Sequence, residues 1–81
     1  ESGRLTRLSV LVPDRPGALA EALAEVARTR ANVIEVHHER AFLAGALGQV
    51  RVDLVVETRG PDHVSALIDA LRLRGFTTTP T

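Results

Sequence analysis

Three stretches of the chain alternate hydrophobic with polar residues, which is the period of a β-strand that buries one of its faces. The first stretch, residues 7–13, has Leu8, Val10 and Val12 on the face predicted to be buried, and Pro13 ends it. The third stretch has the clearest alternation, with its hydrophobic positions at Val50, Val52, Leu54 and Val56. Both stretches are therefore predicted to be half-buried strands.

The second stretch, residues 32–40 (NVIEVHHER), is rich in β-branched residues and is also predicted to be a strand. Strict alternation places one set of side chains on one face (Ile34, Val36, His38) and the rest on the other (Val33, Glu35, His37, Glu39). Since neighbouring side chains on a strand point to opposite faces, His37 and His38 cannot bind one metal ion as a pair. We expect no metal site, and we expect His38 to be packed or to lie at an interface, with a pH-sensitive contact as a secondary role.

Two other stretches have the helical period. In residues 16–28 the apolar stripe is formed by Leu19, Ala22, Leu23, Val26 and Ala27, while Glu21, Glu25 and Arg28 are predicted to lie away from it. Asp14 is placed to cap this helix, and Pro16 suits its first turn. The second helix follows Gly60-Pro61, has its stripe at Val64, Leu67, Ile68 and Leu71, and stops at Gly75.

The order of these elements predicts the fold class. Residues 41–48 are expected to connect two strands as a hairpin, and residues 76–79 supply a short last strand. The resulting β-α-β-β-α-β order, with one apolar stripe on each helix, predicts an α+β protein, the ferredoxin-like βαββαβ sandwich. In that fold both helices cover one face of a four-stranded antiparallel sheet. Residues 1–4 are expected to be a flexible entry and residues 5–81 one domain.

Composition narrows the possible functions. The net charge is zero and there is no Cys and no Lys, so we expect no nucleic-acid partner, no thiol nucleophile and no Schiff-base chemistry. The open face of the third strand carries no aromatic side chain on which RNA bases could stack. The chain has no apolar run long enough to span a membrane and no signal peptide, and we expect a cytoplasmic protein that makes no membrane contact. We assign no catalytic residue and do not expect the chain to be an enzyme.

The turn VPDRPGALA, residues 12–20, is the candidate binding site. A helix N-terminus offers free N–H groups and a positive dipole end to an anion. A phosphate is disfavoured because the turn lacks the Lys and the glycines of a phosphate loop. A small carboxylate remains open, as does the alternative that Gly17 only permits tight packing of the helix on the sheet.

The turn DRPGAL, followed by ANVIEV, resembles the ACT domain, a small regulatory module that binds amino acids. The stretches VHHER and LGQVRVDLVVETRGPDH are similar to the ACT segment at the C-terminus of threonine dehydratases (threonine ammonia-lyases). The resemblance implies that two copies join side by side into a continuous eight-stranded sheet, with amino-acid sites at the seam. It also implies isoleucine or valine as effector, and a catalytic domain N-terminal to this segment that holds pyridoxal phosphate; this chain itself would hold no cofactor.

The resemblance and the chemistry of the turn together give a set of ligand-binding residues. The set is Asp14, Arg15, Pro16, Gly17, Ala18, Leu19, Asn32, Val33 and Ile34. Asn32 is implied to reach the site from the neighbouring domain, while Leu19, Val33 and Ile34 are expected to form an apolar wall. The alternative is a dimerisation module of the same fold that binds no ligand.

Overall fold

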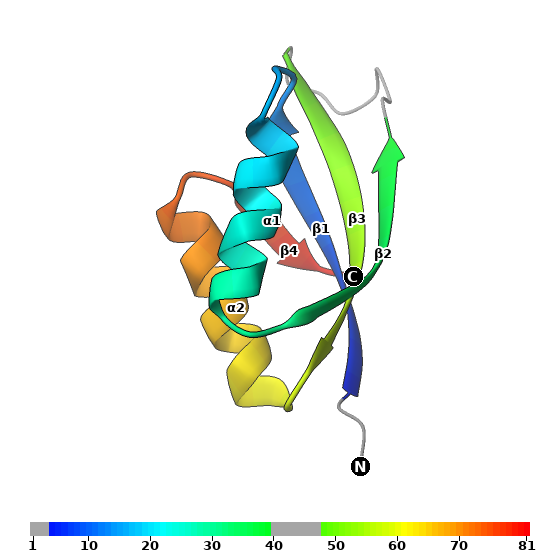
Figure 1. Cartoon of the computed structure of the whole chain (residues 1–81), viewed down its shortest axis with the longest axis vertical. Helices are drawn as coiled ribbons and strands as arrows, with labels where there is room; N and C mark the ends of the chain where they lie inside the picture. The colour runs from blue at the N-terminus through cyan, green and yellow to red at the C-terminus, as the bar shows by residue number, and fades with distance from the viewer. Residues whose placement is uncertain (1–3, 40–47) are drawn as a thin grey trace.

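The computed structural model describes residues 4–39 and 48–81. The described elements follow the predicted order: β1 (Arg4–Pro13), α1 (Ala18–Arg28), β2 (Asn32–Glu39), β3 (Gln49–Thr58), α2 (Pro61–Leu73) and β4 (Thr77–Pro80). Both helices lie on the same face of the sheet (Figure 1). The first strand starts at Arg4, which is one residue inside the segment predicted to be a flexible entry. The predicted hairpin connection, residues 41–48, lies outside the described residues except for Gly48.

The sheet has the strand order β2-β3-β1-β4, and each neighbouring pair is antiparallel. The two central strands, β1 and β3, pair over their whole length, from Arg4 opposite Thr58 to Pro13 opposite Gln49. The edge strands are β2 and β4. This arrangement confirms the predicted ferredoxin-like sandwich.

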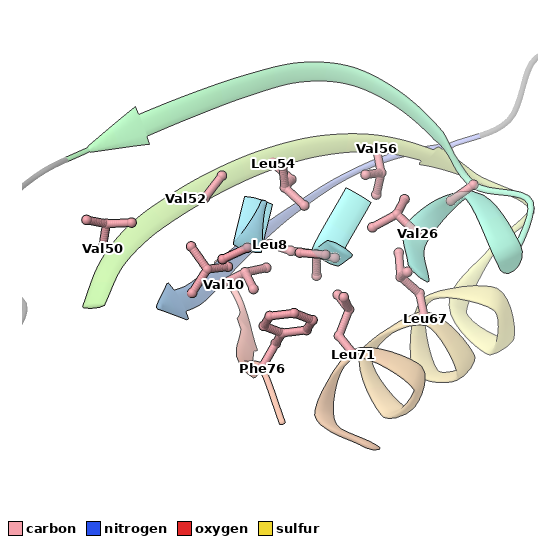
Figure 2. Close-up of a cluster of buried hydrophobic side chains, with 14 residues drawn as sticks. Leu8, Val10, Val26, Val50, Val52, Leu54, Val56, Leu67, Leu71 and Phe76 are labelled. Atoms are coloured by element: carbon pink, nitrogen blue, oxygen red, sulfur yellow. The ribbon is translucent and has the colours of Figure 1, made fainter. Parts of the chain in front are cut away.

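The core is aliphatic and lies between the sheet and the helices (Figure 2). It is made by alternate residues of the two central strands and by the apolar stripes of the helices, with Phe76 as the one aromatic ring among the described core residues. The fully buried large side chains include Leu8, Leu54, Leu67 and Leu71. The predicted faces of β1 and β3 are therefore confirmed.

The predicted faces of β2 are wrong at its start. The pairing of β2 with β3 shifts between Val33 and Glu35, which marks a β-bulge at Ile34. A bulge adds one residue to one strand of a pair, so the alternation on either side of it changes phase. Val33 therefore packs against the core, on the helix side with Val36 and His38, whereas strict alternation had grouped it with Glu35 and His37.

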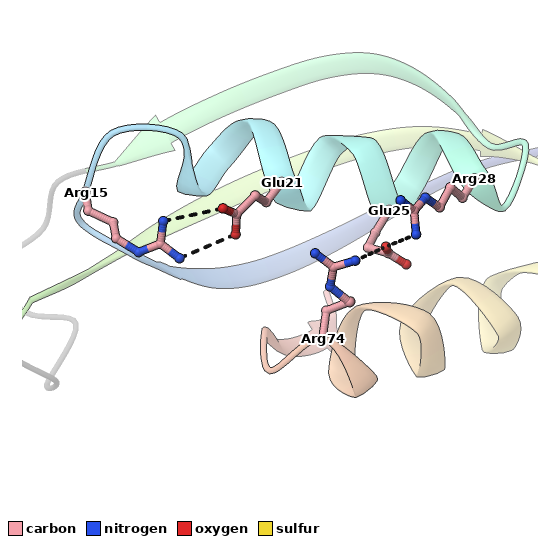
Figure 3. Close-up of polar contacts among 5 residues, drawn as sticks. All are labelled: Arg15, Glu21, Glu25, Arg28 and Arg74. Carbon is pink, nitrogen blue, oxygen red and sulfur yellow. Dashed lines mark hydrogen bonds and ion pairs between the residues drawn. The ribbon is translucent and has the colours of Figure 1, made fainter.

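Helix α1 differs from its prediction at one buried position. Glu25 is only 7% exposed, although the pattern placed it away from the core, and Ala27 is exposed instead. The carboxylate accepts hydrogen bonds from Arg28 at 3.1 Å and from Arg74, just after α2, at 2.9 Å (Figure 3). A buried charge is tolerated when it is paired and hydrogen-bonded, and the two guanidinium groups supply both conditions.

His63 makes a second polar link between the two helices. It is 7% exposed, near the start of α2. Its Nδ1 accepts from the backbone N–H of Arg59 at 3.0 Å, and its Nε2 lies 2.5 Å from the carbonyl oxygen of Thr29, at the end of α1. A carbonyl can only accept, so Nε2 carries the proton and His63 is held in one neutral tautomer. The Nε2 contact therefore joins the two helices, while the Nδ1 contact holds the turn that leads into α2.

Candidate functional site

The turn between β1 and α1 begins with Asp14, whose N–H donates to the carbonyl of Gly48 at 2.7 Å. The helix starts at Ala18, and Gly17 is the N-cap residue. The predicted capping role of Asp14 and the predicted place of Pro16 in the first helical turn are therefore wrong, because both residues precede the N-cap.

Gly17 is needed for its backbone conformation. Its φ is +87°, which is the left-handed region that residues with a Cβ rarely adopt. A Cβ built on Gly17 meets no heavy atom within 4 Å. The interpretation that the glycine permits tight packing of the helix on the sheet is therefore wrong, and the space beside it is open.

The first turn of α1 offers backbone donors. The N–H of Ala18 donates to the carbonyl of Arg15 at 3.2 Å, and the N–H of Glu21 donates to that of Gly17 at 3.0 Å. Between them, the N–H groups of Leu19 and Ala20 find no acceptor among residues 4–39 and 48–81. Such free donors, together with the positive end of the helix dipole, favour an anionic group.

A cavity of about 300 Å³ adjoins this turn. Its lining residues are Val12, Pro13, Asp14, Arg15, Pro16, Leu19, His38 and Val50. Most of this lining is apolar, and the charged side chains lie in the turn. The size and the mixture of apolar and polar groups suit a small amphipathic molecule.

The structure brings together Asp14, Arg15, Pro16 and Leu19 of the predicted site at this cavity. Arg15 makes a 3.4 Å ion pair with Glu21, and both side chains are about half exposed (Figure 3). Gly17 is exposed beside the cavity. Ala18 is fully buried in the core and its N–H is already bonded, so its side chain does not reach the cavity.

The other predicted residues lie elsewhere in the chain. Asn32 stands at the first position of β2, opposite Glu57, whereas the cavity lies beside the far end of β2. Helix α1 separates the two ends and is about 16 Å long. Val33 packs against the core, and Ile34 is 48% exposed at the bulge. Within one chain, therefore, Asn32 and the turn do not form a single site.

His38 and Val50 also line the cavity, although neither belongs to the predicted site or to the turn of residues 12–20; His38 is the polar one of the two. It pairs with Val52 across β2 and β3 and lies on the helix side of the sheet. The signal was present in the sequence as a polar residue on an otherwise apolar face. What could not be seen was that the end of β2 lies next to a turn some 20 residues earlier in the chain.

A wider cavity of about 460 Å³ lies on the open face of the sheet. It is lined by side chains of both charges, among them Arg7, Glu35, Arg51 and Asp53. Arg51 and Asp53 form a 3.6 Å ion pair with both side chains well exposed. Its lining contains no Phe, Tyr or Trp and only two aliphatic residues, Leu54 and Val55, and it indicates a solvated surface rather than a site for an aliphatic ligand.

The described residues offer neither a metal site nor a membrane-spanning helix. None of their His, Asp and Glu side chains gather in a group of three or more that could hold a metal ion. None of the described helices is long and apolar enough to cross a membrane.

Comparison with known proteins shows which family this chain matches. The model of the ACT domain family matches residues 6–72. Two curated relatives are L-threonine ammonia-lyases: that of Geobacter sulfurreducens is 35% identical over 93% of this chain, and that of Thermotoga maritima is 37% identical over 94%. The chain spans only 19% of the length of each. Among solved structures, the ACT domain from GTP pyrophosphokinase of Chlorobium tepidum superposes with a TM-score of 0.73 at 16% identity, with both chains fully covered.

Proposed function

Since the chain belongs to the ACT domain family, whose members are regulatory rather than catalytic domains, we propose that it binds an aliphatic amino acid and thereby controls a threonine ammonia-lyase. The catalytic domain would lie N-terminal to this segment, outside the chain, and would hold the pyridoxal phosphate. The chain itself contains no Lys to bind that cofactor as a Schiff base. The observation that carries the proposal is the cavity of about 300 Å³ at the start of α1.

The chemistry of this cavity matches the three parts of an amino acid. The free N–H groups of Leu19 and Ala20 suit the carboxylate. The carboxylate of Asp14 is opposite in charge to the ammonium. Val12, Leu19 and Val50 provide an apolar wall for a side chain such as that of isoleucine or valine. This volume is too small for a large ligand.

The edge of β2 is the surface that we assign to the second copy. Among the described residues, Ile34 and Val36 on this strand are exposed by 48% and 41%, which is high for large aliphatic side chains. An edge strand also presents unpaired backbone N–H and C=O groups to another chain. Pairing of two β2 edges would extend both sheets into one and cover these side chains.

A two-fold axis makes such a pair of β2 strands antiparallel. Asn32 is at one end of β2 and His38 is near the other, so this pairing places the partner's Asn32 near the cavity of the first chain. The separation of Asn32 from the turn within one chain is then explained, because the complete site requires both chains. The ligand would bridge the two copies and favour one arrangement of the attached catalytic domains.

The second candidate function is a dimerisation module that binds no ligand. The exposed Ile34 and Val36 favour it as much as they favour the first, because they require a partner chain but no amino acid. Only ligand binding separates the two functions.

The test is calorimetric titration of this chain with isoleucine, valine, leucine, threonine and serine, with light scattering to establish the oligomeric state. We expect a dimer that binds isoleucine or valine in preference to serine. In an amide NMR titration, Leu19, Ala20 and Asn32 should shift. A dimer that binds none of the five amino acids at millimolar concentration would instead establish the dimerisation module.

A further inference from the structure

His38 lies at the cavity as an exposed side chain near the end of β2. Its backbone pairs with Val52, and its neighbours in the lining include Val12, Leu19 and Val50. An imidazole in this place faces the same space as the apolar wall of the cavity.

The imidazole of His38 makes no hydrogen bond or ion pair within residues 4–39 and 48–81. His63 differs in this respect, since both of its ring nitrogens are hydrogen-bonded, one to the end of α1 and the other to the turn before α2. The structure thus assigns a packing role to His63, while the ring nitrogens of His38 remain available to a ligand.

The described charged groups that face His38 at the cavity are Asp14 and Arg15, both from the turn before α1. Arg15 is paired with Glu21. The residues that line the cavity from β1 and β3, Val12 and Val50, are neutral, as is Val52, the partner of His38 in the sheet. Histidine is the side-chain type that ordinarily changes charge between about pH 5 and 8. Its cationic form donates a charge-assisted hydrogen bond to a carboxylate.

We propose that His38, as an imidazolium, binds the carboxylate of the amino-acid effector together with the free N–H groups of Leu19 and Ala20, and makes effector affinity depend on pH. The inference rests on the proposed function, because it concerns the same cavity. Protonated His38 binds the anionic carboxylate better than neutral His38 does. By linkage, affinity is highest at the acidic end of the range and falls as the pH rises and the imidazole loses its proton.

His37 provides a matched control, because it is the next residue on the same strand but faces the open side of the sheet, opposite Asp53. The experiment is calorimetric titration of isoleucine into the wild-type chain, His38→Gln, His38→Leu and His37→Gln at about pH 6 and about pH 8. Both values lie above the range in which side-chain carboxyl groups ordinarily titrate. Light scattering of each variant establishes that it remains a dimer.

We expect wild type and His37→Gln to bind isoleucine several-fold more tightly at the lower pH. His38→Leu should lose at least about tenfold in affinity at about pH 6, the loss of one hydrogen bond to a charged group. His38→Gln keeps an N–H donor but cannot become a cation, so it should bind at an intermediate level that does not change with pH. This loss of the pH dependence is a result that a merely structural role of His38 would not give.

Failure of this inference can be told apart from failure of the proposed function. If wild type binds isoleucine and His38→Gln keeps the same pH dependence, His38 has no such role, although the domain still senses an amino acid. A loss of affinity in His37→Gln but not in His38→Gln would overturn the inference and move the ligand to the open face of the sheet. If wild type binds no amino acid at either pH, both the inference and the proposed function are wrong.

Discussion

Replacement of Gly17 with alanine tests the physical reason for a glycine at the start of α1. The residue has a φ of +87°, and a Cβ on it would meet no heavy atom within 4 Å. The cost of Gly17→Ala therefore comes from the left-handed backbone, about 1–2 kcal/mol of the free energy of unfolding. The lower entropy of the unfolded alanine chain offsets part of this loss. We expect a net loss of about 1 kcal/mol, or about 4–8 °C in Tm for a domain of this size.

Gly75→Ala is the matched control for this substitution. Gly75 follows α2, has a φ of +92°, and also has no heavy atom within 4 Å of an added Cβ. The two substitutions should therefore destabilise the fold by similar amounts. Only Gly17 lies beside the free N–H groups of α1, so only Gly17→Ala should weaken amino-acid binding.

Urea denaturation followed by circular dichroism measures the stability of both variants, and calorimetric titration measures their affinity for isoleucine. A loss of about 3 kcal/mol or more in Gly17→Ala, with a loss near 1 kcal/mol in Gly75→Ala, would refute the assignment of the cost to backbone conformation alone. Equal affinities in the two variants would refute the role of the space beside Gly17 in ligand binding.

Three further predictions concern the packing of the helices and the edge of the sheet. In double-mutant cycles from urea denaturation, the coupling energy of Glu25 to Arg74 should be about 1 kcal/mol and that of Glu25 to Arg28 about 0.3 kcal/mol. The second pair is weaker because the Arg28 side chain is 70% exposed and lies on the same helix as Glu25. Equal coupling energies would contradict this prediction. His63→Ala should lower the free energy of unfolding by about 2–3 kcal/mol, since it removes two partly buried hydrogen bonds and leaves their partners unpaired. A loss below about 0.5 kcal/mol in the same assay would show that water replaces these two hydrogen bonds. Val36→Lys should give a monomer in light scattering, because a charge on an edge strand opposes edge-to-edge pairing. Its free energy of unfolding should lie within about 0.5 kcal/mol of that of the wild-type monomer. A variant that is still a dimer would show that the dimer interface is not the edge of β2.

The helix and strand periods predicted the fold because each element of this chain repeats its pattern over several residues. Leu8, Val10 and Val12 in β1 and the matching residues in β3 are buried as their alternation predicts. The error in β2 arose from the single extra residue at Ile34. Alternation cannot reveal a bulge, since the sequence shows only neighbours along the strand and not the pairing across strands.

The helical periods did not reveal which charged and polar side chains are buried. Glutamate is ordinarily exposed to solvent, and the burial of Glu25 depends on Arg74, which lies 49 positions away. His63 likewise takes a core-facing position because one of its partners, the carbonyl oxygen of Thr29, lies 34 positions away at the end of α1. Long-range partners of this kind decide whether a polar side chain can be buried, and no local pattern contains them.

The sequence alone determined the strand and helix order, the aliphatic core, and the turn from Asp14 to Leu19 as the candidate site, because periodicity, composition and turn chemistry are local properties of the chain. Only the tertiary structure decided that the glycine serves a left-handed backbone, that Asn32 lies at the far end of α1 from this turn, and that His38 lines the cavity. The first of these facts is a backbone angle, and the other two depend on how β2 runs antiparallel to β3 and brings its last residues close to the turn before α1. The return of β2 along the sheet is the physical reason that His38, and not Asn32 of the same chain, meets the turn.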